Sequence, residues 1–191
     1  MPLVMMSGPA LEPVTVSEAK AHLRLDASDE DVLIASLILT SRLHVETALG
    51  LALITQSWKL VLDCWPDDAA LKFPLGPVSA VAAVRVLAAD GTPAVVPAAS
   101  YIVDGDALGS RLVRTAATWP LPGRAARGIE IDFTAGMGPA AADVAQPIRH
   151  AILLLVAHWY EHRDPFEIGS PGAAIPASVT ELLKPYRAVR L

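Results

Sequence analysis

Hydrophobic and polar positions first follow a helical period near the start of the chain. Residues 15–18 have the spacing of a capping box, in which the side chains of Thr15 and Glu18 each accept the other's backbone N–H. The apolar positions that follow lie on one side of a helix. The pattern predicts a short helix that ends at Leu23 or Arg24, after an irregular lead-in over residues 1–14.

A second helix is expected from Ser28, whose hydroxyl can cap its first turn, up to Gly50, which suits the left-handed residue after a helix. Residues 32–39 are apolar almost all the way round this helix. Such a helix is covered on more than one side, so we expect cover from its own domain and from a neighbouring subunit. Beyond residue 39 the helix becomes amphipathic, and Arg42 and Glu46 are expected to face solvent.

The period changes to the alternation of strands after residue 51. An Asp-Gly pair at residues 90–91 predicts a tight hairpin, and Asp104-Gly105-Asp106 predicts a turn. The alternation predicts a mostly antiparallel β layer of about five or six strands. The strand-like segments are 57–63, 71–75, 81–87, 94–96, 101–103, 111–113 and 128–133, with Ile129, Ile131 and Phe133 of the last facing inward.

The last third returns to a helical period. Pro147 suits the first turn of a long helix that continues to about His162, and Asp164-Pro165 ends it. We interpret residues 165–177 as an exposed linker and 178–189 as a short amphipathic segment that needs a surface to pack on. The fold class is therefore predicted as α+β, with a domain over residues 1–164 and a linker and arm over 165–191.

Composition and charge narrow the possible partners. The net charge is −5 with a pI of about 5.5, and the sequence holds no basic run, so a strong grip on DNA phosphates is not expected. The apolar runs fall short of the roughly 20 residues that span a bilayer, and no signal peptide is apparent. We expect a soluble protein made in the cytoplasm, without a membrane partner.

One motif suggests metal chemistry. Residues 158–162 read HWYEH, the inverted zinc-protease pattern, in which His158 and His162 lie on one helix face and Glu161 is the candidate base. A third ligand would have to come from Glu167 or Glu181. The alternative interpretation is that these residues form the end of a helix. His158 would then be half-buried, and His162 would lie in the exposed last turn, where histidine interacts favourably with the negative end of the helix dipole.

Other catalytic patterns are missing, and no cofactor is predicted. The segment around Gly136 and Gly138 lacks the lysine and the glycine spacing of a phosphate-binding loop. Cys64 is interpreted as a small core residue. Asp104 and Asp106 fit a turn better than a cation site. A small-ligand module on the β layer would need a polar cluster that the sequence does not reveal. We therefore favour a non-enzymatic protein that works by contact.

Two stretches resemble the head–tail connector (adaptor) proteins of long-tailed bacteriophages and phage-like gene transfer agents. The resemblance covers about residues 12–164, departs from the family at Met137, and makes HWYEH part of a family helix. The matching residues in the first stretch are Val14, Glu18, Ala19, Lys20, Leu23, Arg24, Asp31, Ile34, Glu46, Gly50, Thr55, Gln56, Trp58 and Pro66. Those in the second are Ala135, Gly136, Gly138, Pro147, Ile148, Ala151, His158, Tyr160 and Glu161.

The resemblance implies a ring in the particle neck. Adaptors of this family typically assemble in twelve copies under the portal protein, extend the DNA channel and meet a tail-side connector or stopper protein. DNA would then pass through without sequence-specific binding, which agrees with the acidic composition. The residues expected to contact partners are Val32, Leu33, Ile34, Leu37 and Ile38 of the second helix and Leu182, Leu183, Tyr186, Val189 and Leu191 of the arm.

Overall fold

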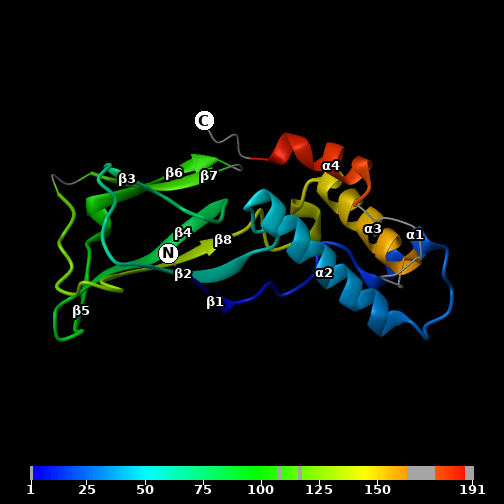
Figure 1. The fold of residues 1–191 in the computed structure, drawn as a ribbon, viewed down its shortest axis with the longest axis horizontal. Helices are drawn as coiled ribbons and strands as arrows, with labels where there is room; N and C mark the ends of the chain where they lie inside the picture. The colour runs from blue at the N-terminus through cyan, green and yellow to red at the C-terminus, as the bar shows by residue number, and fades with distance from the viewer. Residues whose placement is uncertain (1, 107–108, 116–117, 163–174, 188–191) are drawn as a thin grey trace, which may run out of the picture. The chain divides into compact units, whose positions relative to one another are not determined.

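A computed structural model describes residues 2–106, 109–115, 118–162 and 175–187 (Figure 1). The fold is α+β, as predicted, and the chain forms two compact units. Unit 1 contains residues 1–10 and 55–139, and unit 2 contains residues 11–54 and 140–191. Each unit is thus built from two separate stretches of sequence.

Unit 2 is helical. Its elements are α1 (Val16–Leu23), α2 (Asp31–Leu49), α3 (Gln146–Glu161) and α4 (Ala177–Leu183), with short 3₁₀ turns at Ala141–Asp143 and Lys184–Tyr186. Helix α3 packs against the other three helices, and α1 also contacts α2. The capping box at Thr15 is confirmed, as is the left-handed Gly50 that ends α2, with φ of 68°. Ser28 does not cap α2, which begins at Asp31 without a side-chain cap.

Helix α2 is the most apolar element of unit 2. Among the described residues it alone is long and apolar enough to cross a membrane, with a mean hydropathy of 1.4, but core helices share this property. Ile34, Ile38 and Val45 are at most 1% exposed and pack inside unit 2. The helix therefore has one side in the core.

Unit 1 contains two antiparallel sheets. The larger has the order β1 (Leu3–Ser7), β2 (Gln56–Leu62), β8 (Ile129–Ala135), β4 (Val78–Leu87) and β5 (Pro93–Val95). The smaller has the order β3 (Ala70–Lys72), β7 (Gly109–Arg114) and β6 (Tyr101–Asp106). The Asp-Gly hairpin is confirmed between β4 and β5, with Gly91 at φ of 90°.

The core of unit 1 lies between its sheets. The predicted inward residues of β8 are confirmed, because Ile129, Ile131 and Phe133 are at most 1% exposed. The ring of Phe73, just after β3, lies 4.9 Å from that of Phe133. Contact between these rings ties the small sheet to the large one, so the single β layer predicted from the sequence is in fact two sheets.

Three local predictions for unit 1 were wrong. The lead-in is not irregular throughout, because β1 pairs with β2 and satisfies backbone groups at that edge. Asp104-Gly105-Asp106 is not a turn, since β6 runs through it to pair with β7. Cys64 is exposed instead of lying in the core.

Candidate functional site

A buried ion-pair cluster fixes the start of unit 2. Arg42 donates from Nε to Glu12 at 2.7 Å and from Nη1 to Glu46 at 2.6 Å. The other carboxylate oxygen of Glu46 accepts the Leu53 N–H at 2.9 Å. Arg42 is 4% exposed and Glu46 8%, so the prediction that they face solvent was wrong.

Charge pairing explains how this arginine tolerates burial. Burial alone lowers the pKa of Arg42, but the hydrogen bond to Glu12 and the charges of Glu46 and Glu12 outweigh it, and the net pKa is raised. The cluster therefore carries a permanent charge that holds the lead-in and the segment after α2 onto that helix. Its role is structural, because every group in it is occupied by another part of unit 2.

A second polar cluster joins α1 to α3. Arg149 donates from Nε to the Pro13 carbonyl at 2.9 Å and forms an ion pair with Glu18. The pKa of Glu18 is lowered, mainly by the hydrogen bond from the Thr15 backbone N–H and further by the Thr15 hydroxyl and Arg149. Partial burial of the carboxylate opposes this effect. The capping box that begins α1 is thus also a contact with α3.

The HWYEH segment has the geometry of a helix end. His158 is half-buried, as expected, while Glu161 and His162 are exposed. The two imidazole rings lie 4.6 Å apart, and Nδ1 of His162 lies 2.8 Å from the His158 carbonyl oxygen. Within the described ranges no three His, Cys, Asp or Glu side chains gather where a metal ion could bind, and Glu167 lies outside them. Among the residues that the structure describes, no third ligand joins the two histidines.

The outer side of α2 is an exposed apolar face. We call Val32, Leu33, Leu39 and Leu43 the α2 face; their exposed fractions are 85%, 36%, 42% and 45%. Leu37 is half-buried, whereas Ile34 and Ile38 are buried in the core of unit 2. Of the residues predicted to contact partners on this helix, Val32, Leu33 and Leu37 therefore have accessible side chains.

An open pocket adjoins the α2 face. It has a volume of about 250 Å³. Its walls are mainly apolar, and they include Leu11, Val14, Val16, Ala35 and Ile38. Ala35 lies one helical turn from Leu39, so the pocket borders the exposed face. Sequence patterns could not reveal this pocket, because its walls come from the lead-in, α1 and α2 together.

The N-terminal strand carries the second exposed apolar group. We call Val4, Met5 and Met6 the N-terminal patch; their exposed fractions are 46%, 44% and 59%. Pairing with β2 shifts register between Met5 and Ser7, which leaves Met6 as the extra residue of a bulge. Sequence reasoning missed this patch, although residues 2–11 form an uncharged run that could have signalled it.

The described part of the arm is divided between core and surface. Val179 and Leu183 of α4 are 1% and 2% exposed, and α4 packs on α3. Leu182 and Tyr186 are half-buried at the surface. Val189 and Leu191 lie outside the described residues. Of the predicted arm contacts, Leu182 and Tyr186 are thus placed where a partner can reach them.

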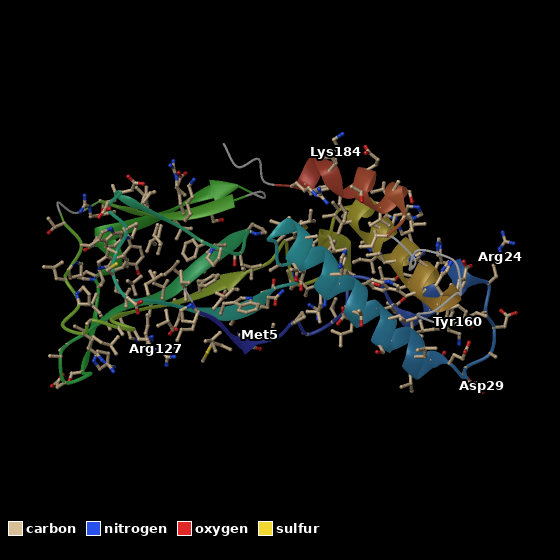
Figure 2. All side chains as sticks on the ribbon, in the orientation of Figure 1. Met5, Arg24, Asp29, Arg127, Tyr160 and Lys184 are labelled. Carbon is tan, nitrogen blue, oxygen red and sulfur yellow. The ribbon has the colours of Figure 1, made fainter. Side chains whose placement is uncertain are left out.

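Charged side chains on the large sheet are paired with each other. Nζ of Lys59 in β2 lies 2.9 Å from Oε2 of Glu130 in β8. Nη1 of Arg85 in β4 lies 2.5 Å from Oδ2 of Asp132 in β8. These cross-strand pairs stabilise the sheet, and their charges are largely neutralised. Figure 2 shows polar side chains distributed over the molecule. An open pocket of about 490 Å³ beside α1 includes Lys20 and Asp31, and these two residues form an ion pair with each other. The candidate functional surfaces are therefore apolar contact faces.

The fold is shared with solved components of a virus-like particle. No protein-family profile matches the chain, and no curated protein does. A chain in the virion of a native gene transfer agent (GTA) particle is 28% identical, with a TM-score of 0.86 over 100% of this chain and 97% of that one. A chain in the neck of a native GTA particle, computed with C12 symmetry, is 27% identical with a TM-score of 0.80.

The likeness to a third solved chain extends to sequence as well as fold. A chain in the neck of an empty GTA particle, computed with C6 symmetry, is 30% identical, with a TM-score of 0.86 over 100% of this chain and 97% of that one. Near-complete coverage in both directions means that the two chains share both units and their order. At this identity and coverage, the chain belongs to the family of that gene transfer agent neck protein.

Proposed function

We propose that the protein is a structural component of the neck of a phage-like particle, where several copies form a ring. The observation that carries this proposal is the 30% identity to a GTA neck chain over 97% of its length. The symmetry of the related neck structures, C6 and C12, supports a ring of copies. Twelve is the copy number we favour, because it agrees with the adaptor resemblance.

The finer role that we propose is that of a head–tail adaptor. The ring would lie under the portal protein, extend the DNA channel and meet a tail-side connector or stopper. Leu182 and Tyr186 are the side chains that we assign to the portal contact, because they are accessible while Val179 and Leu183 hold α4 on α3.

The first test is assembly with the portal protein encoded in the same gene cluster. Size-exclusion chromatography with light scattering is expected to give a complex of ring size with a one-to-one mass ratio. Absence of a complex over a range of salt and protein concentration would contradict the adaptor role.

The arm assignment has a sharper test. Leu182→Asp and Tyr186→Asp each place a charge at the assigned contact, and we expect each to weaken portal binding about tenfold or more. Thr180→Asp adds the same charge at an exposed position of α4 and should bind as the unmodified chain does. Equal loss in all three variants would mean that α4 as a whole is disturbed, and no loss in any would remove the arm from the contact.

A hydrolase centred on His158, Glu161 and His162 is not supported by the geometry or by the comparisons. We therefore propose no catalytic activity. A titration of the purified chain with zinc, followed by elemental analysis, is expected to leave no stoichiometric metal on it.

A further inference from the structure

We propose that the α2 face of one copy packs against the N-terminal patch of the next copy, and that this contact closes the ring. The inference rests on the proposed ring, and it adds the two surfaces that meet. It also assigns the apolar pocket beside α2 as the receptor for Met6 of the neighbouring copy.

The α2 face lacks the charges that a solvated helix carries. From Val32 to Leu49 the only Asp, Glu, Lys or Arg residues are Arg42 and Glu46, and both are buried in their own ion-pair cluster. From Val32 to Leu49, the exposed positions of this helix are therefore all uncharged. A surface helix normally bears charged residues opposite its buried side, so this composition indicates a face covered by protein.

The N-terminal patch has the same character. Residues 2–11 contain no charged side chain, and three consecutive large side chains, Val4, Met5 and Met6, are at least 44% exposed. Strand β1 also lies at the edge of its sheet, with β2 on one side only. An apolar strand at a sheet edge promotes association unless it is covered, so this patch also needs a partner.

Ring symmetry decides how these two surfaces pair. A surface that packs on its own copy makes a two-fold dimer, whereas a closed ring of more than two subunits needs two different, complementary patches. The α2 face therefore cannot be its own partner around a ring. The N-terminal patch belongs to the other unit and supplies the second surface that the symmetry requires.

Another pair of exposed apolar side chains in unit 1 fits less well. Ile102 and Val103 of β6 are 53% and 39% exposed, but they precede Asp104, whose exposed ion pair with Arg111 would meet an uncharged helix face. Covering that ion pair with apolar side chains costs free energy. The uncharged N-terminal patch can be covered by the α2 face without this cost.

The pocket beside α2 provides a specific binding site for one side chain of the neighbouring copy. Its walls are mainly apolar and include Ala35, which lies one helical turn from Leu39 of the α2 face. Met6 has an exposed, unbranched side chain at a bulge, and methionine adapts its shape to irregular apolar spaces. Insertion of Met6 would fix the register of the two surfaces in addition to burying apolar area.

Cysteine cross-linking between separately labelled copies tests the pairing. In a Cys64→Ser background, Met6→Cys and Leu39→Cys are placed on different chains, mixed with the portal protein, and treated with a short bismaleimide. We expect a cross-linked dimer from the mixture and none from either variant alone. A chain with both cysteines should give a ladder of covalent oligomers, because each copy then links to a neighbour on both sides.

The matched control places the second cysteine elsewhere. Val95→Cys lies on β5 and is 68% exposed in the native chain, so it is at least as reactive as position 6, yet it should not cross-link to Leu39→Cys. Rings of normal mass without the 6–39 cross-link would overturn the pairing and leave the proposed neck function intact. Failure of the unmodified chain to form any ring would overturn both.

Charge insertion provides an independent readout. We expect Met6→Asp and Leu39→Asp each to raise the protein concentration for half-maximal ring assembly about tenfold or more, because a carboxylate would be buried without a partner. Val95→Asp should assemble normally. Thermal unfolding of the unassembled chain should change little in all three, since these side chains are exposed. Normal assembly by both test variants would contradict the inference.

Discussion

At the scale of single residues, Arg42 shows how one buried charge organises unit 2. Its guanidinium joins Glu12 in the lead-in to Glu46 on its own helix, and Glu46 in turn accepts the Leu53 N–H. Removing a single member leaves the others buried without compensation. The cost of such a change exceeds the contribution of the ion pair itself.

We therefore expect Arg42→Ala to lower the free energy of unfolding by about 3–5 kcal/mol, because it leaves Glu46 buried without its cation. Urea unfolding followed by circular dichroism measures the change. Arg111→Ala is the control: it breaks an exposed ion pair with Asp104 and should cost at most about 1 kcal/mol. Equal effects in the two variants would contradict the structural role of the buried cluster.

Gly105 has a conformational role inside β6. Its φ is 154°, and a Cβ there would lie 2.3 Å from the Gly109 carbonyl oxygen and 2.6 Å from Cα of Ser110. We expect Gly105→Ala to destabilise unit 1 by about 1–3 kcal/mol, measured by urea unfolding. Gly109→Ala in the paired strand is the control, because a Cβ at that position has no heavy atom within 4 Å. A neutral Gly105→Ala would disprove the close approach of β7.

Glu18 gives the stability of unit 2 a dependence on pH. Its pKa is lowered in the folded chain, so the stabilisation is complete above the unfolded value of about 4.3 and is lost as the pH falls through the folded value. We expect Glu18→Gln, which keeps a capping side chain, to be less stable than the unmodified chain at pH 7. The difference should vanish at strongly acidic pH, and urea unfolding at both pH values tests this.

At the scale of elements, α4 belongs to the core of unit 2 as well as to its surface. Leu183 and Val179 are buried on α3, while Leu182 on the neighbouring face of the same turn remains accessible. We expect Leu183→Ala to lower the free energy of unfolding by about 2–5 kcal/mol and Leu182→Ala to change it little. Thermal or urea unfolding distinguishes the two. A silent Leu183→Ala would mean that α4 is not docked in solution.

The elements differed in how far sequence could predict them. Helix ends were well predicted where a capping box or a glycine fixed them, and β8 was well predicted because Ile129, Ile131 and Phe133 alternate with polar residues. Strand β1 was missed because residues 3–6 do not alternate, and its pairing depends on β2, which lies about 50 residues away in sequence. The three-stranded sheet was missed for the same reason, since pattern reveals strands but not their neighbours.

The surfaces that contact partners could likewise be predicted only in part from the sequence. Helical periodicity showed that α2 is apolar over much of its length. It could not separate the residues that face the core, Ile34 and Ile38, from the exposed Val32, Leu33 and Leu39. The solvent placement of Arg42 and Glu46 was wrong because their partners, Glu12 and the Leu53 N–H, come from segments with no regular pattern. Tertiary context therefore decided which side of the helix is free.

At the scale of the whole molecule, charge is unevenly divided between the units. Unit 1 has seven Lys and Arg residues against eight Asp and Glu, whereas unit 2 has eight against twelve. We expect the chain to bind duplex DNA more weakly than about 10⁻⁴ M at physiological salt, as measured by fluorescence anisotropy. A double variant, Asp26→Lys with Asp29→Lys, should bind more tightly. Tight, salt-sensitive binding by the unmodified chain would contradict passive passage of DNA.

The interleaving of the two units has a consequence for biosynthesis. The chain passes between the units at residues 10–11, 54–55 and 139–140, so neither unit is one continuous segment. A nascent chain that has emerged from the ribosome up to residue 140 holds every strand of unit 1, but of the unit 2 helices it holds only α1 and α2. The side of α2 that packs on α3 stays uncovered until residues 146–161 have been translated. Competence for assembly is therefore reached late in translation, so incomplete chains are poor candidates for incorporation into a particle.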